Sequence, residues 1–334
     1  MTFLQHPVRV AIVGAGAIGG VLASRLAAVP SVQLSVLARG ATLDALQQGG
    51  LRMTDALGSK TVAMRASEDP ADLGLQDLVI VAVKGPALAE VAPKVRSLLA
   101  PDGMAMIAMN GMPWWFFNGL GGACEGLALQ SVDPCGHIAA AIPEHQVIGS
   151  VVHMSCATTA PAQVQHRSGN GLIIGEPRGG TSARVQALSQ LLGEAGFAAT
   201  VSERIQYDIW YKLWGNMTMN PVSALTGATC DLILADPLTR SFVSAVMLEA
   251  QAVGFGIGCP IDQTPEDRHV VTAKLGAFKT SMLQDVEAGR TIELDALLSS
   301  VREVAQHLGL PTPHTDALLG LTRLMAQTRG LYPK

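Results

Sequence analysis

A short glycine-rich segment is the feature that most constrains the fold of this chain. It reads Gly14-Ala15-Gly16-Ala17-Ile18-Gly19 and stands between an apolar run, 8–13, and a small, apolar stretch with helical character, 18–28. In such a context the first glycine permits a tight turn, the second lets the backbone approach a pyrophosphate, and the third allows close packing of helix on strand. The pattern predicts a dinucleotide-binding turn, and a glycine-rich turn without a ligand is the plainer interpretation.

The first 200 residues alternate short apolar runs with helical segments. Further strands are expected at 32–37, 61–66, 78–83, 104–109, 147–153 and 171–174, and further helices at 87–99 and 183–195. This alternation favours a mostly parallel sheet that is covered by helices. We expect residues 1–200 to form an α/β N-terminal domain, a Rossmann-type doubly wound sheet that binds the nucleotide.

The pattern changes near residue 203. From there on, apolar residues recur at helical intervals and strand signals nearly vanish. Thr291, Gly309 and Thr315 occupy positions that are typical of helix caps, and Gly196 is placed to end the helix at 183–195. Residues 201–334 are therefore expected to form an all-α C-terminal domain that carries the substrate and catalytic residues.

The composition excludes several classes of function. The 334 residues carry a formal net charge of −4 with no basic block, so nucleic-acid binding is not expected. No apolar stretch approaches the ~20 residues that cross a bilayer, and no secretory signal is apparent at the N-terminus. The five cysteines have no metal-ligand spacing. We expect a cytoplasmic protein without a membrane segment or a metal site.

The second predicted strand carries information about the nucleotide. Sites that prefer NAD usually place an acidic residue at the tip of this strand, where it binds the ribose hydroxyls. Here the strand is followed by Ala38 and Arg39, with no carboxylate at the tip. An arginine can pair with a 2′-phosphate through charge-assisted hydrogen bonds. The sequence therefore favours NADPH as the cofactor, and the alternative is that Arg39 is an ordinary surface arginine.

Two further polar residues follow predicted parallel strands. Lys84 comes directly after the run 78–83, and Asn110 comes directly after the run 104–109. Open α/β sheets bind ligands at the carboxyl ends of their strands. Each residue alone could be a solvated strand end, but the two together predict a site beside the nicotinamide.

A buried helix with one polar face is expected around residues 210–221. Lys212, Asn216 and Asn220 are spaced by four residues, so they share one helix face, and the residues around them are mostly apolar. Buried polar groups need partners, which a polar substrate would supply. The alternative is a lysine that reaches solvent and asparagines that bond to nearby backbone.

Two residues further along have ordinary explanations when they are considered alone. Ser281 is a helical serine, and Glu293 is expected in the first turn of a helix, where the helix dipole stabilises a carboxylate.

Taken together, these residues resemble the ketopantoate reductase family over nearly the whole chain. The motifs that match are residues 14–19, Arg39, Val83-Lys84, Asn110-Gly111-Met112, Lys212…Asn216…Asn220-Pro221, residues 281–285 and Glu293. The resemblance implies an N-terminal Rossmann domain joined to a helical domain with the active site between them, and reduction of 2-dehydropantoate (ketopantoate) to pantoate with NADPH, a step toward pantothenate.

The resemblance also implies roles for individual residues. Lys212 is similar to the family's general acid, and Asn216, Asn220 and Ser281 are similar to its substrate-binding residues. Asn110 resembles the residue that touches both cofactor and substrate. Lys84 and Glu293 resemble cofactor-side residues, and Glu293 would also orient Lys212 in catalysis. The cofactor's phosphates would lie on Gly14, Ala15, Gly16, Ala17, Ile18 and Gly19.

Three departures from the family leave the substrate open. The loop after Met112 reads Pro113-Trp114-Trp115-Phe116-Phe117, the segment 118–148 is long, and Cys230 stands where some members have an asparagine. An aromatic loop near the pocket would favour a bulkier 2-oxo acid, whereas a satellite core or a subunit contact is the plainer interpretation. A non-catalytic NADPH-binding sensor is the alternative of another class. A homodimer, through the helical domain or through 114–117, is also left open.

Overall fold

The structure, a computed structural model, describes residues 7–333. The expectation that the N-terminus carries no secretory signal falls partly on residues 1–6, which lie outside the described residues. The chain forms two compact units. Unit 1 comprises Met1–Met109 and Gly136–Ile205, and unit 2 comprises Asn110–Cys135 and Gln206–Lys334. The sequence predicts one boundary near residue 200 with residues 110–135 in the first domain, whereas the structure groups this segment with the helical unit.

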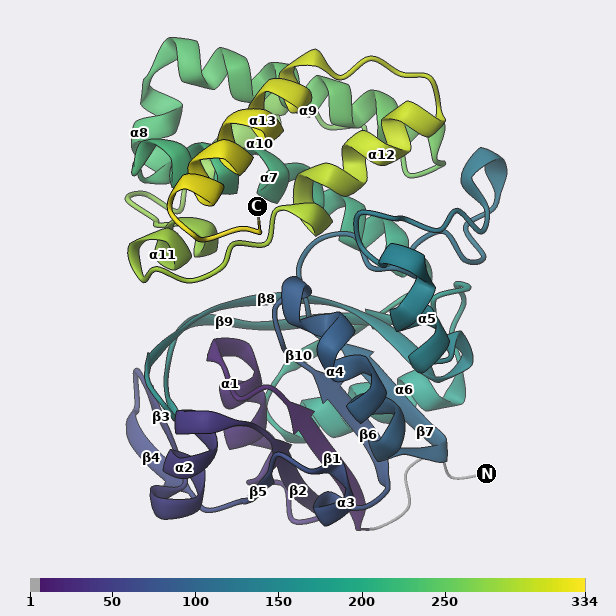
Figure 1. Ribbon diagram of the computed structural model, residues 1–334, viewed down its shortest axis with the longest axis vertical. Helices are drawn as coiled ribbons and strands as arrows, with labels where there is room; N and C mark the ends of the chain where they lie inside the picture. Colours follow the sequence, from purple (N-terminus) through teal and green to yellow (C-terminus); the bar gives the residue numbers. More distant parts are fainter. Residues whose placement is uncertain (1–6, 334) are drawn as a thin grey trace. The chain divides into compact units, whose positions relative to one another are not determined.

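Unit 1 is built on one sheet (Figure 1). Its strands are β1 (Val8–Val13), β2 (Val32–Leu37), β3 (Leu51–Asp55), β4 (Gly58–Val62), β5 (Arg65–Ser67), β6 (Gln76–Val81), β7 (Leu99–Ile107), β8 (Val147–Ala160), β9 (Gln163–Gly175) and β10 (Ala198–Ser202). They lie in the order β4-β3-β9-β8-β7-β6-β1-β2-β5, with β10 beside β9. All neighbouring pairs are parallel except β3–β4 and β8–β9. The expected mostly parallel, Rossmann-like sheet is confirmed.

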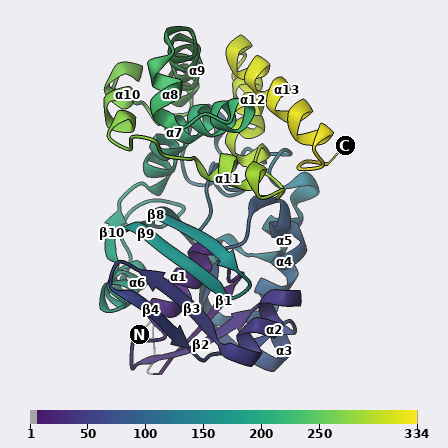
Figure 2. The same ribbon diagram turned by 90° about the vertical axis from the view of Figure 1, so that its left-hand side faces the viewer.

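The sheet curls strongly. Strands β4 and β5 stand at opposite ends of the strand order, yet only Ala63 and Met64 separate them in the chain. Three peptide steps span at most about 11 Å, so the two ends of the sheet must approach each other. Strands β8 and β9 run side by side as a long antiparallel pair (Figure 2) and carry the sheet around helix α1 (Ala17–Leu26). Helix α1 contacts β1, β2, β3, β8 and β9.

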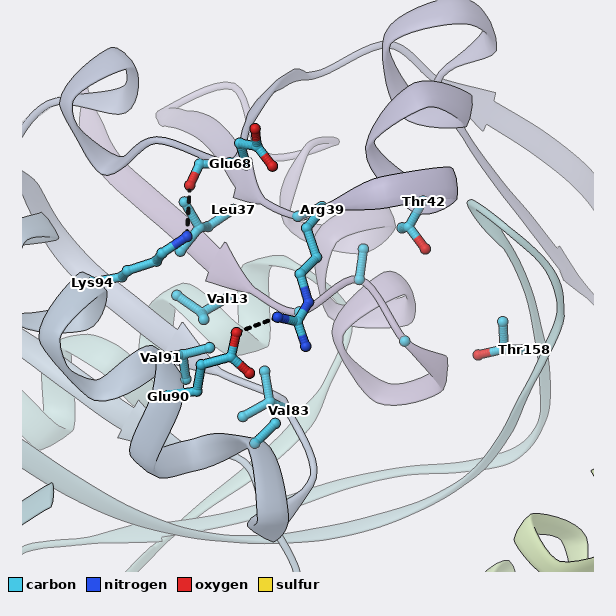
Figure 3. A pocket seen from close by; sticks show the side chains of 15 residues that line it. Val13, Leu37, Arg39, Thr42, Glu68, Val83, Glu90, Val91, Lys94 and Thr158 are labelled. Atoms are coloured by element: carbon cyan, nitrogen blue, oxygen red, sulfur yellow. Dashed lines mark hydrogen bonds and ion pairs between the residues drawn. The ribbon is translucent and has the colours of Figure 1, made fainter. Parts of the chain in front are cut away.

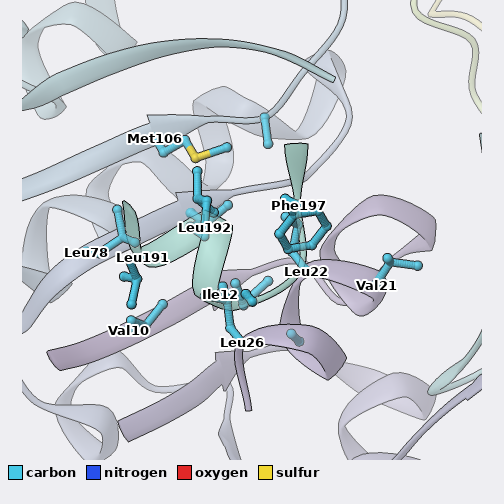
Figure 4. Packing of buried hydrophobic residues seen from close by; sticks show 14 of the residues in the cluster. Val10, Ile12, Val21, Leu22, Leu26, Leu78, Met106, Leu191, Leu192 and Phe197 are labelled. Atoms are coloured by element: carbon cyan, nitrogen blue, oxygen red, sulfur yellow. The ribbon is translucent and has the colours of Figure 1, made fainter. Parts of the chain in front are cut away.

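Side chains of α1 form the centre of the unit 1 core. Leu22 and Leu26 are fully buried and lie near Ile12 of β1 (Figure 4). Leu191 and Leu192 of helix α6 (Ala183–Glu194) belong to the same cluster. The other helices of unit 1 are α2 (Gly40–Gly49), α3 (Pro70–Leu73), α4 (Gly85–Leu98), α5 (His137–Ala141) and the short turn η3 (Glu144–Gln146). This core fixes the strand and the helix that flank the glycine-rich turn.

Unit 2 contains helices joined by loops and has no strand among its described residues. Its helices are α7 (Ile205–Thr226), α8 (Cys230–Ala235), α9 (Pro237–Gly256), α10 (Pro265–Ala273), α11 (Ser281–Glu287), the π-helical turn η4 (Asp295–Ser299), α12 (Ser300–His307) and α13 (Pro313–Thr328), with short turns η1 (Gly122–Cys124) and η2 (Pro134–Gly136). Helix α7 is buried along most of its length, as expected from its apolar residues. The expected all-α C-terminal region is confirmed.

The segment Asn110–Cys135 packs into unit 2 through its aromatic residues. Trp115, Phe116 and Phe117 are fully buried, and the Phe116 ring lies 6.4 Å from the ring of Trp210 on α7. The carboxylate of Glu303 on α12 accepts hydrogen bonds from the backbone N–H of Gln130 at 2.7 Å and of Ser131 at 2.9 Å. The aromatic loop is therefore part of the core of unit 2.

Several predicted element bounds are corrected by the structure. The strand expected at 61–66 is divided between β4 and β5, because one part pairs with β3 and the other with β2. Strands β8 and β9 are longer than expected, because their polar ends pair with each other. Thr315 lies inside α13, which is preceded by Thr312. Gly309 and Gly196 follow helix ends with φ of +68° and +82°, as expected for terminating glycines.

No helix within residues 7–333 combines the length and the hydropathy that a membrane crossing requires.

We predict that Ile12→Ala destabilises unit 1, because the side chain of Ile12 on β1 is fully buried in the core cluster that includes Leu22 and Leu26 of α1. Removal of a buried isoleucine side chain costs about 2–5 kcal/mol. Leu57→Ala is the control, because Leu57 is 98% exposed in the β3–β4 turn and its loss should change stability by less than about 0.5 kcal/mol. Thermal unfolding followed by circular dichroism compares the two variants; equal midpoints would contradict the assigned core.

Candidate functional site

The three glycines of the β1–α1 turn meet three different surroundings. Gly14 has φ of +91°, and a Cβ atom there would lie 2.8 Å from the Val83 side chain. A Cβ atom on Gly19 would lie 1.9 Å from the carbonyl oxygen of Gly14. A Cβ atom on Gly16 would meet nothing within 4 Å. Gly14 and Gly19 are thus required by the fold, whereas Gly16 leaves open space in front of the turn.

Helix α1 begins at this open space. Gly16 is its N-cap residue and has no side chain that could accept a hydrogen bond from the first N–H groups of the helix. These N–H groups and the positive end of the helix dipole favour an anion. The cradle at Gly16, which a Cβ atom would fill, fits the pyrophosphate of a dinucleotide. Ala17 and Ile18 form the first turn of the helix, between Gly16 and Gly19.

A pocket of about 250 Å³ lies beside the turn in unit 1 (Figure 3). Gly14, Ala15 and Gly16 form part of its wall, and Arg39 projects into it from the end of β2. The remaining lining residues are Val13, Leu37, Ala38, Thr42, Glu68, Val83, Ala87, Glu90, Val91, Lys94 and Thr158. The pocket joins the glycine turn to Arg39, which is where the adenosine end of a dinucleotide would lie.

Two charged contacts cross this pocket. The Arg39 guanidinium donates to the carboxylate of Glu90, and the Lys94 ammonium donates to the backbone carbonyl oxygen of Glu68 at 3.0 Å (Figure 3). Arg39 was predicted from the sequence, whereas Glu68, Glu90 and Lys94 were not. Glu90 and Lys94 are spaced by four residues on α4, and this spacing, together with Ala87 and Val91, was the signal that could have found them.

Lys84 and Asn110 follow neighbouring strands, as predicted. Strands β6 and β7 pair in parallel with Val81 opposite Ile107, so both strands end at the same edge of the sheet. Lys84 is the N-cap residue of α4 and is partly buried in unit 1. Asn110 is the first residue of unit 2 and is also partly buried. Neither residue lines the pocket beside Arg39.

Helix α7 carries Lys212, Asn216 and Asn220 on one face, as the sequence predicted. Asn220 is buried, and the other two are partly buried. Leu213, Trp214 and Met217 occupy the apolar side of the helix and are fully buried. Pro221 lies within the helix, directly after Asn220.

The ammonium group of Lys212 has a pKa of about 8, which is well below the usual value for lysine. Burial lowers the pKa, because desolvation disfavours the charged form, and the negative charge of Glu293 opposes this by raising it. An amine with a pKa near neutrality is suited to proton transfer at physiological pH. The structure thus links Lys212 electrostatically to Glu293 within unit 2.

The position of Glu293 differs from the prediction. The sequence placed it in the first turn of a helix that was capped by Thr291, whereas η4 begins only at Asp295. The preceding backbone is bonded elsewhere: the Ile292 N–H donates to the Leu331 carbonyl oxygen at 3.1 Å. Tyr332 also donates to the carboxylate of Asp295 at 2.5 Å. Glu293 therefore lies in a segment that is held by the residues after α13.

Ser281 is exposed, whereas Cys230 is buried. Ser281 is the exposed first residue of α11, where Thr280 caps the helix by accepting from the Leu283 N–H at 3.2 Å. Cys230 is buried at the start of α8, and burial raises the pKa of its thiol to about 11. Cys230 thus remains a neutral thiol at physiological pH.

We predict opposite effects for two alanine substitutions in the turn. Gly19→Ala should destabilise the fold, because its methyl group would overlap the Gly14 carbonyl. Gly16→Ala should keep the fold, because the space is open, but it should weaken dinucleotide binding at least about tenfold, or 1.4 kcal/mol. Thermal unfolding and titration of NADPH fluorescence measure the two effects. Wild-type affinity in Gly16→Ala would contradict a pyrophosphate at this position.

The chain matches known proteins along most of its length. The family described as ketopantoate reductase PanE/ApbA matches residues 10–113, and its C-terminal part matches residues 204–326. A 2-dehydropantoate 2-reductase of Mesorhizobium japonicum is 42% identical over 97% of this chain and 99% of its own length.

Solved structures agree with this assignment. A crystal structure from Ralstonia solanacearum MolK2, provisionally named a ketopantoate reductase, is 56% identical with a TM-score of 0.94 and covers 97% of this chain and 99% of that one. A D-mandelate dehydrogenase, solved with NADH and anilino(oxo)acetate, shares the fold at 18% identity with a TM-score of 0.84 and covers 97% of this chain and 100% of that one. The chain is a member of the ketopantoate reductase family, whose enzymes are nicotinamide-dependent oxidoreductases.

Proposed function

We propose that the protein reduces 2-dehydropantoate to pantoate with NADPH, as a step of pantothenate biosynthesis in the cytoplasm. The observation that carries the proposal is the pairing, within unit 2, of a partly buried lysine with a carboxylate that acts on its charge. The name of the 42% identical relative supports the substrate. The absence of an acidic residue at the tip of β2, where Arg39 follows, supports NADPH.

The cofactor is assigned to unit 1 and to two residues of unit 2. Gly14, Ala15, Gly16, Ala17, Ile18 and Gly19 would hold the pyrophosphate at the start of α1, and Arg39 would bind the 2′-phosphate. Lys84, Asn110 and Glu293 would supply polar contacts near the nicotinamide, as the family resemblance implies. When bound, the nicotinamide supplies the hydride for the reaction.

Lys212 would provide the proton. Reduction of a ketone builds negative charge on its oxygen, and an ammonium group beside that oxygen stabilises the charge and then transfers its proton to it. The neutral amine left behind is favoured by the same burial that lowers the pKa of Lys212. Glu293 would keep a sufficient fraction of Lys212 protonated and orient it.

Three side chains would bind the rest of the substrate. Asn216 and Asn220 present amide groups on the same face of α7 as Lys212, and an amide both donates to and accepts from hydroxyl and carboxylate groups. Ser281 would donate its hydroxyl from the start of α11. For the reaction, Asn110 and the side chains of Asn216, Asn220 and Ser281 would have to contact the same substrate molecule whose ketone carbon receives the hydride.

The aromatic loop gives no support for a bulkier substrate. Trp115, Phe116 and Phe117 are fully buried, and Phe116 contacts Phe117 and Trp210 within unit 2. Their position agrees with the plainer interpretation of this loop, a core. A homodimer remains a prediction, which analytical ultracentrifugation can test.

Steady-state reduction of 2-dehydropantoate with NADPH and NADH in parallel tests the proposal. We expect turnover of 2-dehydropantoate with NADPH. The kcat/KM with NADPH should be at least about tenfold above that with NADH, because a charged arginine contact with phosphate is worth at least about 1.4 kcal/mol. Phenylglyoxylate is the comparison substrate. Fast turnover of phenylglyoxylate beside negligible turnover of 2-dehydropantoate would assign another 2-oxo acid, and no turnover of either would favour a sensor.

The role of Lys212 predicts a mutational effect and a pH profile. Lys212→Ala should lower kcat by about 10²–10⁴-fold with NADPH binding kept, and Lys274→Ala, an exposed lysine on unit 2, should not. Because the protonated amine is the active form, kcat/KM should fall as pH rises through about 8.

Glu293→Gln extends this test. Removal of the carboxylate charge removes the interaction that raises the pKa of Lys212, so the descending limb of the kcat/KM profile should move to lower pH. A limb at unchanged pH in Glu293→Gln, or wild-type kcat in Lys212→Ala, would refute the assigned proton donor.

A further inference from the structure

The pocket beside the glycine turn contains an acidic group that faces the proposed phosphate ligand. Arg39, which we assign to the 2′-phosphate of NADPH, donates to the carboxylate of Glu90 (Figure 3). Glu90 lies on α4 one turn before Lys94, and both residues line the same pocket. The cation that would recognise the phosphate is therefore already engaged by an anion of the protein.

This ion pair is weak enough to be exchanged. The side chains of Arg39 and Glu90 are 68% and 56% exposed. Exposed ion pairs contribute about 0–1 kcal/mol, because water and salt screen them. A phosphate group carries a charge of about −1.5 to −2 at pH 7 and offers more acceptor oxygens than a carboxylate. A 2′-phosphate can thus displace the Glu90 carboxylate from the guanidinium.

The displaced carboxylate remains in the pocket. Helix α4 holds the backbone of Glu90 at the wall of the pocket, so its carboxylate stays near the bound phosphate, and the two negative charges repel each other. The 2′-hydroxyl of NADH causes no such repulsion. A hydroxyl donates to a carboxylate, which is the contact that NAD-preferring sites use at the tip of their second strand.

We propose that Glu90 is a specificity-determining residue that reduces the preference for NADPH over NADH, by pairing with Arg39 in the free protein and by repelling the 2′-phosphate in the complex. The inference rests on the proposed cofactor site and concerns the same pocket. It makes the repulsion by Glu90, beside the attraction by Arg39, one contribution to the cofactor preference of this chain.

Glu90→Gln tests the proposal, because it removes the charge and keeps the shape of the side chain. We expect the Kd for NADPH to fall by about 2- to 5-fold, an amount in the range of one exposed charge interaction, while the Kd for NADH stays equal or rises. Isothermal titration calorimetry with 2′,5′-ADP and 5′-AMP measures the contribution of the 2′-phosphate alone. The affinity for 2′,5′-ADP should rise by the same factor as that for NADPH, and the affinity for 5′-AMP should not change. The gain should shrink in 0.5 M NaCl, because salt screens the charge.

Glu144→Gln is the matched control. Glu144 pairs with Arg178 in unit 1, outside the pocket, so this variant makes the same charge change without touching Arg39. It should leave the affinity for all four ligands unchanged. An equal gain in Glu144→Gln would overturn the proposal, because the effect would then come from net charge.

Two other results would also overturn it. Weaker binding of 2′,5′-ADP by Glu90→Gln would show that Glu90 orients Arg39 toward the phosphate, and unchanged binding would show that it does not act on this ligand. These outcomes are separate from failure of the proposed function. They are measured without substrate, and wild-type protein that binds 2′,5′-ADP while it fails to reduce 2-dehydropantoate would leave the inference about Glu90 in place.

Discussion

The close contact of Gly19 with the Gly14 carbonyl is the constraint on which the rest of unit 1 depends. Only a residue without a Cβ atom fits there, and this lets α1 start directly at the end of β1. The helix can then enter the concave side of the curled sheet, where it contacts β3, β8 and β9 as well as its own strand. One packing contact therefore sets both the open space at Gly16 and the direction in which the helix N-terminus points.

Features with a local cause could be predicted from the sequence. The turn at 14–19 could be predicted because its glycine spacing follows directly on an apolar run. The polar face of α7 could be predicted because Lys212, Asn216 and Asn220 repeat at helical spacing among apolar residues. The strands β1 and β2 were found because both are mostly apolar, and in each strand the last three residues are buried. In these cases the residues that determine the structure lie next to each other in the chain.

Features with a distant cause could not be predicted. The late start of η4 follows from the bond between Ile292 and Leu331, and the length of β8 and β9 follows from pairing between polar residues of the two strands. Glu90 and Lys94 were missed because charged residues four apart on a helix usually form a solvated face. Glu90 and Lys94 can be related to a ligand only through the pocket beside Arg39, and that pocket is formed by five separate segments of unit 1.

The discontinuous path of unit 2 has a consequence for biosynthesis. The aromatic residues after Met112 leave the ribosome before β8, β9, α6 and β10, whereas α7, whose Trp210 lies beside Phe116, follows all of these elements. Until α7 emerges, this aromatic loop lacks its partner from that helix, and exposed apolar residues of this kind promote aggregation and chaperone binding. For the same reason, a fragment that begins at residue 206 would have an incomplete core, so the helical unit cannot be obtained by a single cut of the chain.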